Sequence, residues 1–121
     1  MAVCGSIQNH QSGTSLLCLF DTGSTHTFIK RSALPPGVCG KRVPNKTNNT
    51  LAGTYTTNLI VELQGIQLPE FTKHRTYDSL PARIIPGACR YDVIFGRDAL
   101  SLFQLILDFG KNEMTMAHQQ V

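Results

Sequence analysis

The sequence lacks the cysteine and histidine patterns from which zinc sites are usually built. It has 4 cysteines and 4 histidines, but no C-x-x-C pair, and the histidines are scattered along the chain. Structural zinc sites need such ligands at short, regular spacings, so we predict no zinc site. The cysteine usage favours a reduced, intracellular setting, although a bridge between Cys39 and Cys89 stays open.

Long apolar runs and strong charge are also missing. No run approaches the ~20 residues that cross a bilayer, and the first residues lack the pattern of a signal peptide. The 11 basic and 8 acidic residues give a net charge of +3, without the dense basic stripe of a nucleic-acid-binding module. We therefore expect a cytoplasmic protein that binds neither a membrane nor, directly, a nucleic acid.

Helical periodicity is nearly absent, and short apolar segments separated by turn residues take its place. The predicted strands are residues 3–7, 15–20, 28–30, 38–43, 83–85 and 92–95. Residues 51–63 alternate with period two, which predicts a half-buried strand, and residues 66–71 are expected to return beside it as a hairpin. Many short strands in 121 residues predict one all-β domain spanning residues 1–121.

The end of the chain is expected to hold the one short helix. Asp98 is well placed to cap a helix that runs through Phe103. A terminal hairpin of residues 105–107 and 113–116 is expected to follow it. Asp98 and Asp92 are therefore interpreted as a helix cap and a strand-end residue rather than as catalytic groups.

One stretch combines a buried strand with an acid. Residues 16–20 are continuously apolar and end at Asp21, which is followed by Thr22, Gly23 and Ser24. A carboxylate at the mouth of a buried strand is costly unless it is hydrogen-bonded or used in chemistry. Gly23 allows a tight turn whose amide groups can face the carboxylate. A plain turn, in which Asp21 caps its own backbone, is the alternative interpretation.

A second stretch gives this acid a context. Residues 91–100 form another apolar strand that is closed by a glycine and followed by a short helical stretch. The pair Asp21-Thr22-Gly23 and Ile94-Phe95-Gly96-Arg97 resembles the retropepsin family of aspartic proteases, over residues 3–116 and in particular those of long-terminal-repeat retrotransposons. A domesticated cellular copy would look the same. The resemblance implies an all-β closed barrel or sandwich with one short helix, active as a homodimer.

The resemblance also implies the chemistry. Family members are endopeptidases that cut a polyprotein with two aspartates and one activated water, without a metal or cofactor, sometimes inside a virus-like particle. The reaction needs two carboxyl groups that share a proton. This chain has one Asp-Thr-Gly, so two copies must pair. Asp21 would activate the water, Thr22 would bond across the two-fold axis, and Gly23 would present backbone groups to the carboxylate and the substrate.

Further residues are implied to hold the peptide or polyprotein substrate. They are Ser24, Thr25, Thr47, Asn48, Asn49 and Phe95. The Ser24 hydroxyl would bond the outer oxygen of the Asp21 carboxylate, unless Ser24 is a plain turn residue. Residues 94–96 would pack beneath the active-site loop. Residues 43–54 would form a flap that closes over the peptide, with its tip near residues 47–49.

The chain departs from the family pattern in two places. Family flaps are often rich in glycine, and here none occurs in the flap before Gly53. The arginine at the position of Arg97 often pairs with an acid just after the Asp-Thr-Gly, but residues 24–27 include none. Its partner is left open among Asp92, Asp98 and a chain terminus.

Two other function classes compete with the protease. Asp-Thr-Gly-Ser-Thr also resembles the phosphate-binding turn of the actin and sugar-kinase superfamily, but that fold needs two α/β domains and a much longer chain. The second is a catalytically weak retropepsin-like domain that serves as a dimerisation or interaction module. Whether the pure chain trims a polyprotein segment separates it from a protease.

Overall fold

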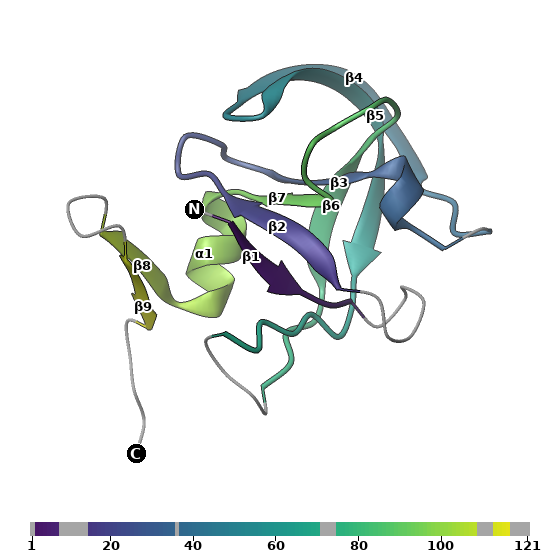
Figure 1. Ribbon diagram of the computed structural model, residues 1–121. Coiled ribbons are helices and arrows are strands. Elements are labelled where there is room, and N and C mark those ends of the chain that lie inside the picture. The colour runs from purple at the N-terminus through teal and green to yellow at the C-terminus, as the bar shows by residue number, and fades with distance from the viewer. Residues whose placement is uncertain (1, 8–14, 36, 71–74, 109–112, 117–121) are drawn as a thin grey trace.

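The computed structural model describes residues 2–7, 15–35, 37–70, 75–108 and 113–116, and strands dominate it (Figure 1). The strands of its seven-stranded sheet are β1 (Ala2–Gly5), β2 (Leu16–Phe20), β3 (Thr27–Lys30), β4 (Lys41–Thr50), β5 (Gly53–Leu63), β6 (Leu80–Ile85) and β7 (Val93–Phe95). They lie in the order β1-β2-β7-β3-β6-β5-β4. The expected all-β class is confirmed.

The remaining elements surround this sheet. A 3₁₀ turn, η1 (Arg31–Ala33), follows β3, and the helix α1 (Arg97–Phe103) follows β7. The strands β8 (Leu105–Asp108) and β9 (Glu113–Met116) pair with each other in a separate two-stranded sheet, which lies apart from the main sheet beyond α1 (Figure 1). The predicted short helix and terminal hairpin are confirmed.

Within the described residues, no helix is both long enough and apolar enough to cross a membrane.

The centre of the sheet brings the two sequence motifs side by side. β2 pairs with β7 in parallel, with Phe20 opposite Phe95, and β7 pairs with β3 in the antiparallel sense. Parallel strands end at the same edge of a sheet, so Asp21 follows β2 where Gly96 follows β7. The backbone N–H of Asp21 donates to the Phe95 carbonyl at 2.9 Å. The two motifs therefore form one structural unit.

The sheet buries apolar side chains on both faces. One face carries the main core, in which the Phe20 and Phe95 rings stack at 5.3 Å and Phe103 of α1 meets Phe95 edge-on at 5.0 Å. The other face carries a small group that we call the covered cluster: Leu19, Phe28, Ile85 and Ile94. Burial on both faces explains why these central strands have continuous apolar runs rather than alternating ones.

The predicted strand 51–63 is confirmed as β5 from Gly53 onwards, with residues 51 and 52 in a turn, but its expected partner is not confirmed. β5 pairs with β4 and β6, so neither of its edges is free for residues 66–71. Gly65 turns the chain away with a φ of 61°, and its N–H donates to the Asp78 carboxylate at 2.6 Å. Ile66 forms only a bridge to Tyr77, and residue 71 lies outside the described part.

β4 extends well beyond the strand predicted at residues 38–43. It begins at Lys41 and continues through the polar segment to Thr50, as the partner of β5. The register shifts between Arg42 and Lys46, where Pro44 has no N–H to donate. Pairing with β5 thus overrides the turn-like composition of this segment, as tertiary context often does.

Candidate active site

The carboxylate of Asp21 is buried and held by backbone amides from two separate segments. The residue as a whole is 2% exposed. Oδ1 accepts from the N–H of Gly23 at 2.9 Å, and Oδ2 accepts from the N–H of Leu51 at 2.9 Å. Each oxygen therefore has the donor that a buried carboxylate requires. The Ser24 N–H closes the turn by donating to the Asp21 carbonyl at 3.1 Å.

Gly96 allows the active-site loop to lie directly against the second motif. A Cβ at this position would overlap the backbone carbonyls of Ser24 and His26. The next N–H, of Arg97, donates to the Ser24 carbonyl at 2.8 Å. A side chain at position 96 would therefore displace the loop that carries Asp21, so the glycine is required for the site and not only for the turn.

Side chains reinforce the same contact. Arg97 Nη2 donates to the Thr25 hydroxyl at 2.9 Å, a partner that was not among the alternatives considered from the sequence. The Thr27 hydroxyl donates to the Asp98 carboxylate at 2.8 Å. The prediction that Asp98 caps the helix is wrong, because Gly96 is the N-cap and Asp98 lies inside the first turn. Its carboxylate accepts from the Ala99 N–H within that turn, at 2.7 Å, and also ties α1 to β3.

Ser24 does not take the predicted role at the carboxylate. The residue is buried, and its hydroxyl donates to the His26 carbonyl at 2.8 Å. A hydroxyl has one proton to donate, so it is not available to Asp21 in this arrangement. The prediction of a bond to the outer carboxylate oxygen is wrong, and the interpretation of Ser24 as a turn residue fits.

The other members of the Asp-Thr-Gly turn face outwards. Gly23 is exposed and uses its N–H on Asp21. Thr22 is half-buried, and its hydroxyl has no hydrogen-bond partner among the described residues. A second copy of the chain would have to supply the partner that the expected bond across an axis requires.

The prediction that Phe95 binds the substrate is wrong. It is fully buried, between the rings of Phe20 and Phe103. The related prediction, that residues 94–96 pack beneath the active-site loop, is confirmed by the contacts of Gly96 and by the bond from Asp21 to the Phe95 carbonyl.

The expected flap exists as a hairpin, but its tip is elsewhere. Residues 47–49 lie within β4, opposite residues 54–56 of β5, and the turn is formed by Leu51 and Ala52. Gly53 closes the turn with a φ of 139°, which favours glycine. The polar residues that looked like a tip instead pair across the strands, as the bond of 2.7 Å between the Thr47 and Thr56 hydroxyls shows.

The other two predicted tip residues, Asn48 and Asn49, also lie in the paired part of β4 and β5, which we call the shaft of the hairpin. The Asn49 side-chain oxygen accepts from the Thr54 hydroxyl at 2.7 Å. Asn48 Oδ1 is buried without a hydrogen-bond partner among the described residues. A buried acceptor without a donor is costly, so Asn48 is the one of the three that a further molecule would stabilise.

The hairpin tip covers Asp21. Besides the bond from the Leu51 N–H, Ala52 and Tyr55 pack against the covered cluster on the Asp21 side of the sheet. The side chain of Leu51 itself points to solvent and is 72% exposed. The predicted flap of residues 43–54 included Leu51 and Ala52 but did not place them at its tip, and it left out Tyr55. The signal that would have found the tip is Gly53, which marks a turn just before it.

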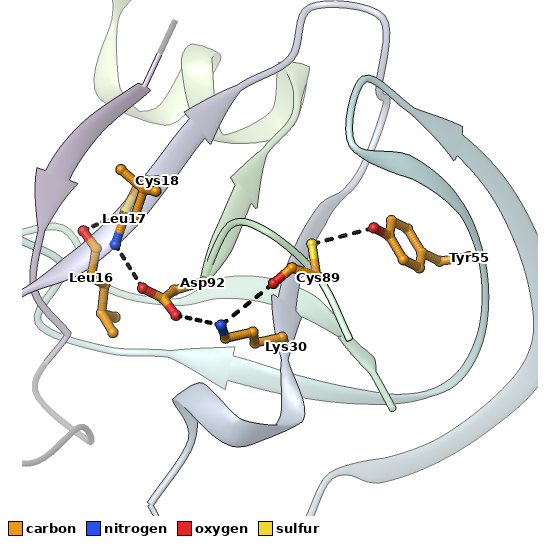
Figure 2. Close-up of polar contacts among 7 residues, drawn as sticks. All are labelled: Leu16, Leu17, Cys18, Lys30, Tyr55, Cys89 and Asp92. Atoms are coloured by element: carbon orange, nitrogen blue, oxygen red, sulfur yellow. Dashed lines mark hydrogen bonds and ion pairs between the residues drawn. The ribbon is translucent and has the colours of Figure 1, made fainter. Parts of the chain in front are cut away.

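A tyrosine holds the tip in place. The Tyr55 hydroxyl donates to the Ala52 carbonyl at 3.0 Å. It also lies 3.4 Å from Cys89 Sγ, a contact shown in Figure 2. The bond with Cys89, together with burial, raises the pKa of Tyr55 to about 12. The hydroxyl therefore keeps its proton at neutral pH and remains a donor.

Asp92 fastens the sheet at the start of β2, the end opposite Asp21. Its Oδ2 accepts from the Leu17 N–H at 2.8 Å, and its Oδ1 lies 3.0 Å from Lys30 Nζ (Figure 2). These contacts join β2 to β3, so the interpretation of Asp92 as a strand-end residue fits. Cys39 and Cys89 are both free, so the bridge left open is not formed. Cys18 is buried in the core, and burial raises the pKa of its thiol to about 12.

Comparisons with known proteins give a likeness of fold. A scan against family models finds no match for the chain, and a search of curated proteins finds none. Among solved structures, the chain is similar to Lpg0085 from Legionella pneumophila subsp. pneumophila str. Philadelphia 1, a protein of unknown function (DUF785). The match has a TM-score of 0.51 and 15% identity, and it covers 84% of each chain. At this identity the likeness concerns the fold alone.

Proposed function

We propose that this protein is an aspartic endopeptidase of the retropepsin type, active as a homodimer. The observation that carries the proposal is the buried Asp21 carboxylate, which lies at the end of the paired strands β2 and β7 and beneath the tip of the β4–β5 hairpin. A rigid acid under a hairpin that can open is what hydrolysis of an extended peptide needs.

Two Asp21 carboxyl groups, one from each copy, perform the reaction. The ionised group takes a proton from a water molecule while the protonated one donates to the carbonyl oxygen of the peptide. The water oxygen bonds to the carbonyl carbon and forms a tetrahedral diol. The diol then gives one hydroxyl proton to the ionised carboxylate, the C–N bond breaks, and the nitrogen leaves with the proton of the other carboxyl group, which restores the singly protonated dyad. Because one shared proton is required, the rate falls at both low and high pH.

The hairpin controls access to this dyad. In the single chain the Leu51 N–H occupies Asp21 Oδ2, the oxygen that a water molecule or the second carboxyl group would use. The tip therefore has to move before the dyad can form and a peptide can enter. The exposed side chain of Leu51 then meets the substrate or the second copy, which gives a reason for an apolar side chain in solvent beside an acid.

Several features of the single chain support pairing. One carboxylate per chain gives half a site, and Thr22 and Asn48 both carry polar groups that a second molecule would satisfy. Closure of the sheet into a barrel also belongs to the proposal. The bridge from Ser6 to Gln67 supports it, because it links the β1 edge to the segment after β5.

The test is hydrolysis of a polyprotein segment, as in a long-terminal-repeat retrotransposon, fused to the chain or added to it. Asp21→Asn keeps the size of the side chain but cannot share the proton, so hydrolysis is expected to fall by several orders of magnitude. Asp78→Asn is the matched control, because Asp78 is exposed and also accepts one backbone N–H, from Gly65. Equal rates for the parent and Asp21→Asn would refute the proposal.

A dimerisation or interaction module with little proteolysis is the second candidate. The contact between the Leu51 N–H and Asp21 favours it, because a hairpin that stays down would leave the carboxylate covered. A chain that dimerises but cleaves no polyprotein segment, with or without Asp21→Asn, would select this function.

A further inference from the structure

Three cationic side chains surround the loop that follows Asp21, and each binds a neutral partner. Lys46 Nζ lies 2.9 Å from His26 Nε2, and Arg97 Nη2 donates to the Thr25 hydroxyl at 2.9 Å. Arg83 donates through Nε to the Thr57 hydroxyl at 2.9 Å. Among the described residues the one ion pair is that of Lys30 with Asp92, so none of these three cations is paired with a carboxylate there.

The pKa of His26 reflects the excess of positive charge around this loop. Partial burial lowers the pKa of its imidazole below the ordinary 6.5, and the positive charges of Lys46 and Arg83 lower it further, while Asp98 acts in the opposite direction. The neutral ring accepts a hydrogen bond from the Lys46 ammonium. We call His26, Lys46 and Arg83 the basic margin. An added anion would be favoured by Lys46 and Arg83 directly and by protonation of His26.

In the proposed function the peptide lies between the Asp21 loop and the β4–β5 hairpin, and the basic margin joins these same two segments. His26 belongs to the loop that carries Asp21, and Lys46 belongs to β4, the strand that leads to the tip residue above Asp21. A strand advances about 3.3 Å per residue, so Lys46 lies at most about 17 Å along the strand from Leu51. An extended peptide between loop and hairpin, with its cleaved bond at Asp21, therefore passes the basic margin within about five residues.

We propose that the basic margin selects substrates with an acidic side chain within about five residues of the cleaved bond. This inference rests on the proposed endopeptidase function and names its substrate class. A glutamate or aspartate replaces the neutral partners of the margin with a charge-assisted hydrogen bond to Lys46 and a favourable interaction with Arg83. The present bonds of Lys46 and Arg83 have one charged member, whereas a carboxylate adds a second, opposite charge. Because opposite charges attract each other, the acidic side chain is held in preference to the present contacts.

The experiment is cleavage of matched peptides by the full chain. Synthetic peptides of random sequence are digested, and the cleaved bonds are identified by mass spectrometry. From a cleaved sequence, pairs are made that differ only by Glu or Lys at one position on either side of the bond. At the position that faces the margin, the Glu peptide is expected to be cut about tenfold faster than the Lys peptide, the ratio given by about 1.4 kcal/mol.

Charge reversal assigns the preference to Lys46. Lys46→Glu is expected to favour the Lys peptide, whereas Lys41→Glu, which makes the same charge change at an exposed position further along β4, keeps the preference of the parent. Cleavage with no preference between Glu and Lys at any position, or the same preference in Lys46→Glu, overturns the inference and leaves the proposed function standing. Absence of cleavage of every peptide overturns the proposed function, and this inference with it.

A binding measurement gives an independent readout. In the inactive Asp21→Asn chain, the imidazole of His26 is titrated by NMR with and without the uncleaved peptides. The Glu peptide is expected to raise the pKa of His26 and the Lys peptide is not. If neither peptide changes the pKa of His26 in the Asp21→Asn chain, the inference is contradicted, even where the parent chain cleaves both peptides.

Discussion

Asp21 is held by backbone groups, and this decides what single substitutions around it can change. The donors to its carboxylate are the N–H groups of Gly23 and Leu51, which a change of side chain does not remove. Ser24, in contrast, acts through its side chain, but on the His26 carbonyl. Substitutions in this loop are therefore expected to act through the position of the backbone.

Ser24→Ala tests this view of the loop. It removes a buried hydrogen bond and leaves the His26 carbonyl without its donor, so the free energy of unfolding is expected to fall by about 1–3 kcal/mol. The pH profile of hydrolysis is expected to stay in place, because the hydroxyl does not touch the carboxylate. Urea denaturation and a pH–rate profile measure the two effects.

The control for Ser24 is Ser101→Ala, at an exposed position of α1. Substitutions at such surface positions change stability by about 0.5 kcal/mol or less. A pH–rate profile that moves in Ser24→Ala would show that the hydroxyl reaches the carboxylate during the reaction after all.

His26 gives the stability of the protein a pH dependence. Burial, Lys46 and Arg83 lower the pKa of its imidazole in the folded state below the ordinary 6.5, so the unfolded chain binds the proton more readily. The contribution of His26 to stability is therefore complete above pH 6.5 and is lost as the pH falls through the lower folded-state pKa.

Chemical denaturation of the parent and of His26→Gln at a series of pH values measures this effect. The free energy of unfolding of the parent is expected to fall more between neutral and mildly acidic pH than that of His26→Gln. Lys46→Met is expected to reduce the difference, because it removes one of the two cations that disfavour protonation. Identical pH dependences for parent and His26→Gln would contradict the assignment.

At the scale of elements, the β4–β5 hairpin is the part that joins stability to access. In its shaft, β4 and β5 pair through ladder bonds and hydroxyl contacts. Its tip, in contrast, is held by the Leu51 N–H and by Tyr55. Few contacts hold the tip compared with the shaft, and such segments open locally before the rest of a fold. The hairpin is thus expected to open at the end that covers Asp21.

Tyr55→Phe tests what holds the tip. The change keeps the ring on the covered cluster and removes the hydroxyl contacts to the Ala52 carbonyl and Cys89 Sγ. Amide exchange of Leu51 is expected to accelerate up to about tenfold, the effect of one hydrogen bond of about 0.5–1.5 kcal/mol. Hydrogen exchange followed by NMR measures it. Tyr77→Phe, in the main core, is the control, and equal acceleration by both would show a general loss of stability instead.

The success of sequence reasoning also differs between elements for physical reasons. The strands around Asp21 were predictable because burial on both faces imposes continuous apolar runs. The strand after Pro44 was not, because its polar side chains pair with one another across the hairpin and carry no apolar signal. Similarly, residues 66–71 read as a strand, but whether an edge of β5 was free depends on β6, which is remote in sequence.

The site followed the same pattern. Asp21 and Gly96 could be predicted from the sequence because their own surroundings, a buried strand followed by a tight turn, require those residue types. The contacts of Leu51 and Lys46 could not, because they depend on the distance over which the hairpin reaches back to the loop. The role assigned to Ser24 failed because its hydroxyl donates to the His26 carbonyl, and the sequence does not show which acceptor a turn hydroxyl takes.

At the scale of the whole molecule, activity is expected to depend on the concentration of the chain. A single chain supplies one Asp21, so specific activity should fall on dilution as the dimer dissociates. Thr22→Val removes the hydroxyl that lacks a partner in the described part of the single chain and is expected to weaken the dimer by about 1–3 kcal/mol. Analytical ultracentrifugation and activity at matched concentrations measure both, and an active monomer would contradict the dimeric mechanism.

The parallel pairing of β2 with β7 means that the loop carrying Asp21 can fold only after β7 has been synthesised. Asp21 is made early, but the Phe95 carbonyl that binds its N–H and the glycine that leaves room for its loop are made much later in the chain. A ribosome adds about 5–20 residues per second, so the carboxylate spends seconds without its scaffold while the intervening strands emerge. A nascent chain that ends before β7 therefore contains the acid but not its pocket, and the endopeptidase activity that we propose has to wait until translation has passed Gly96.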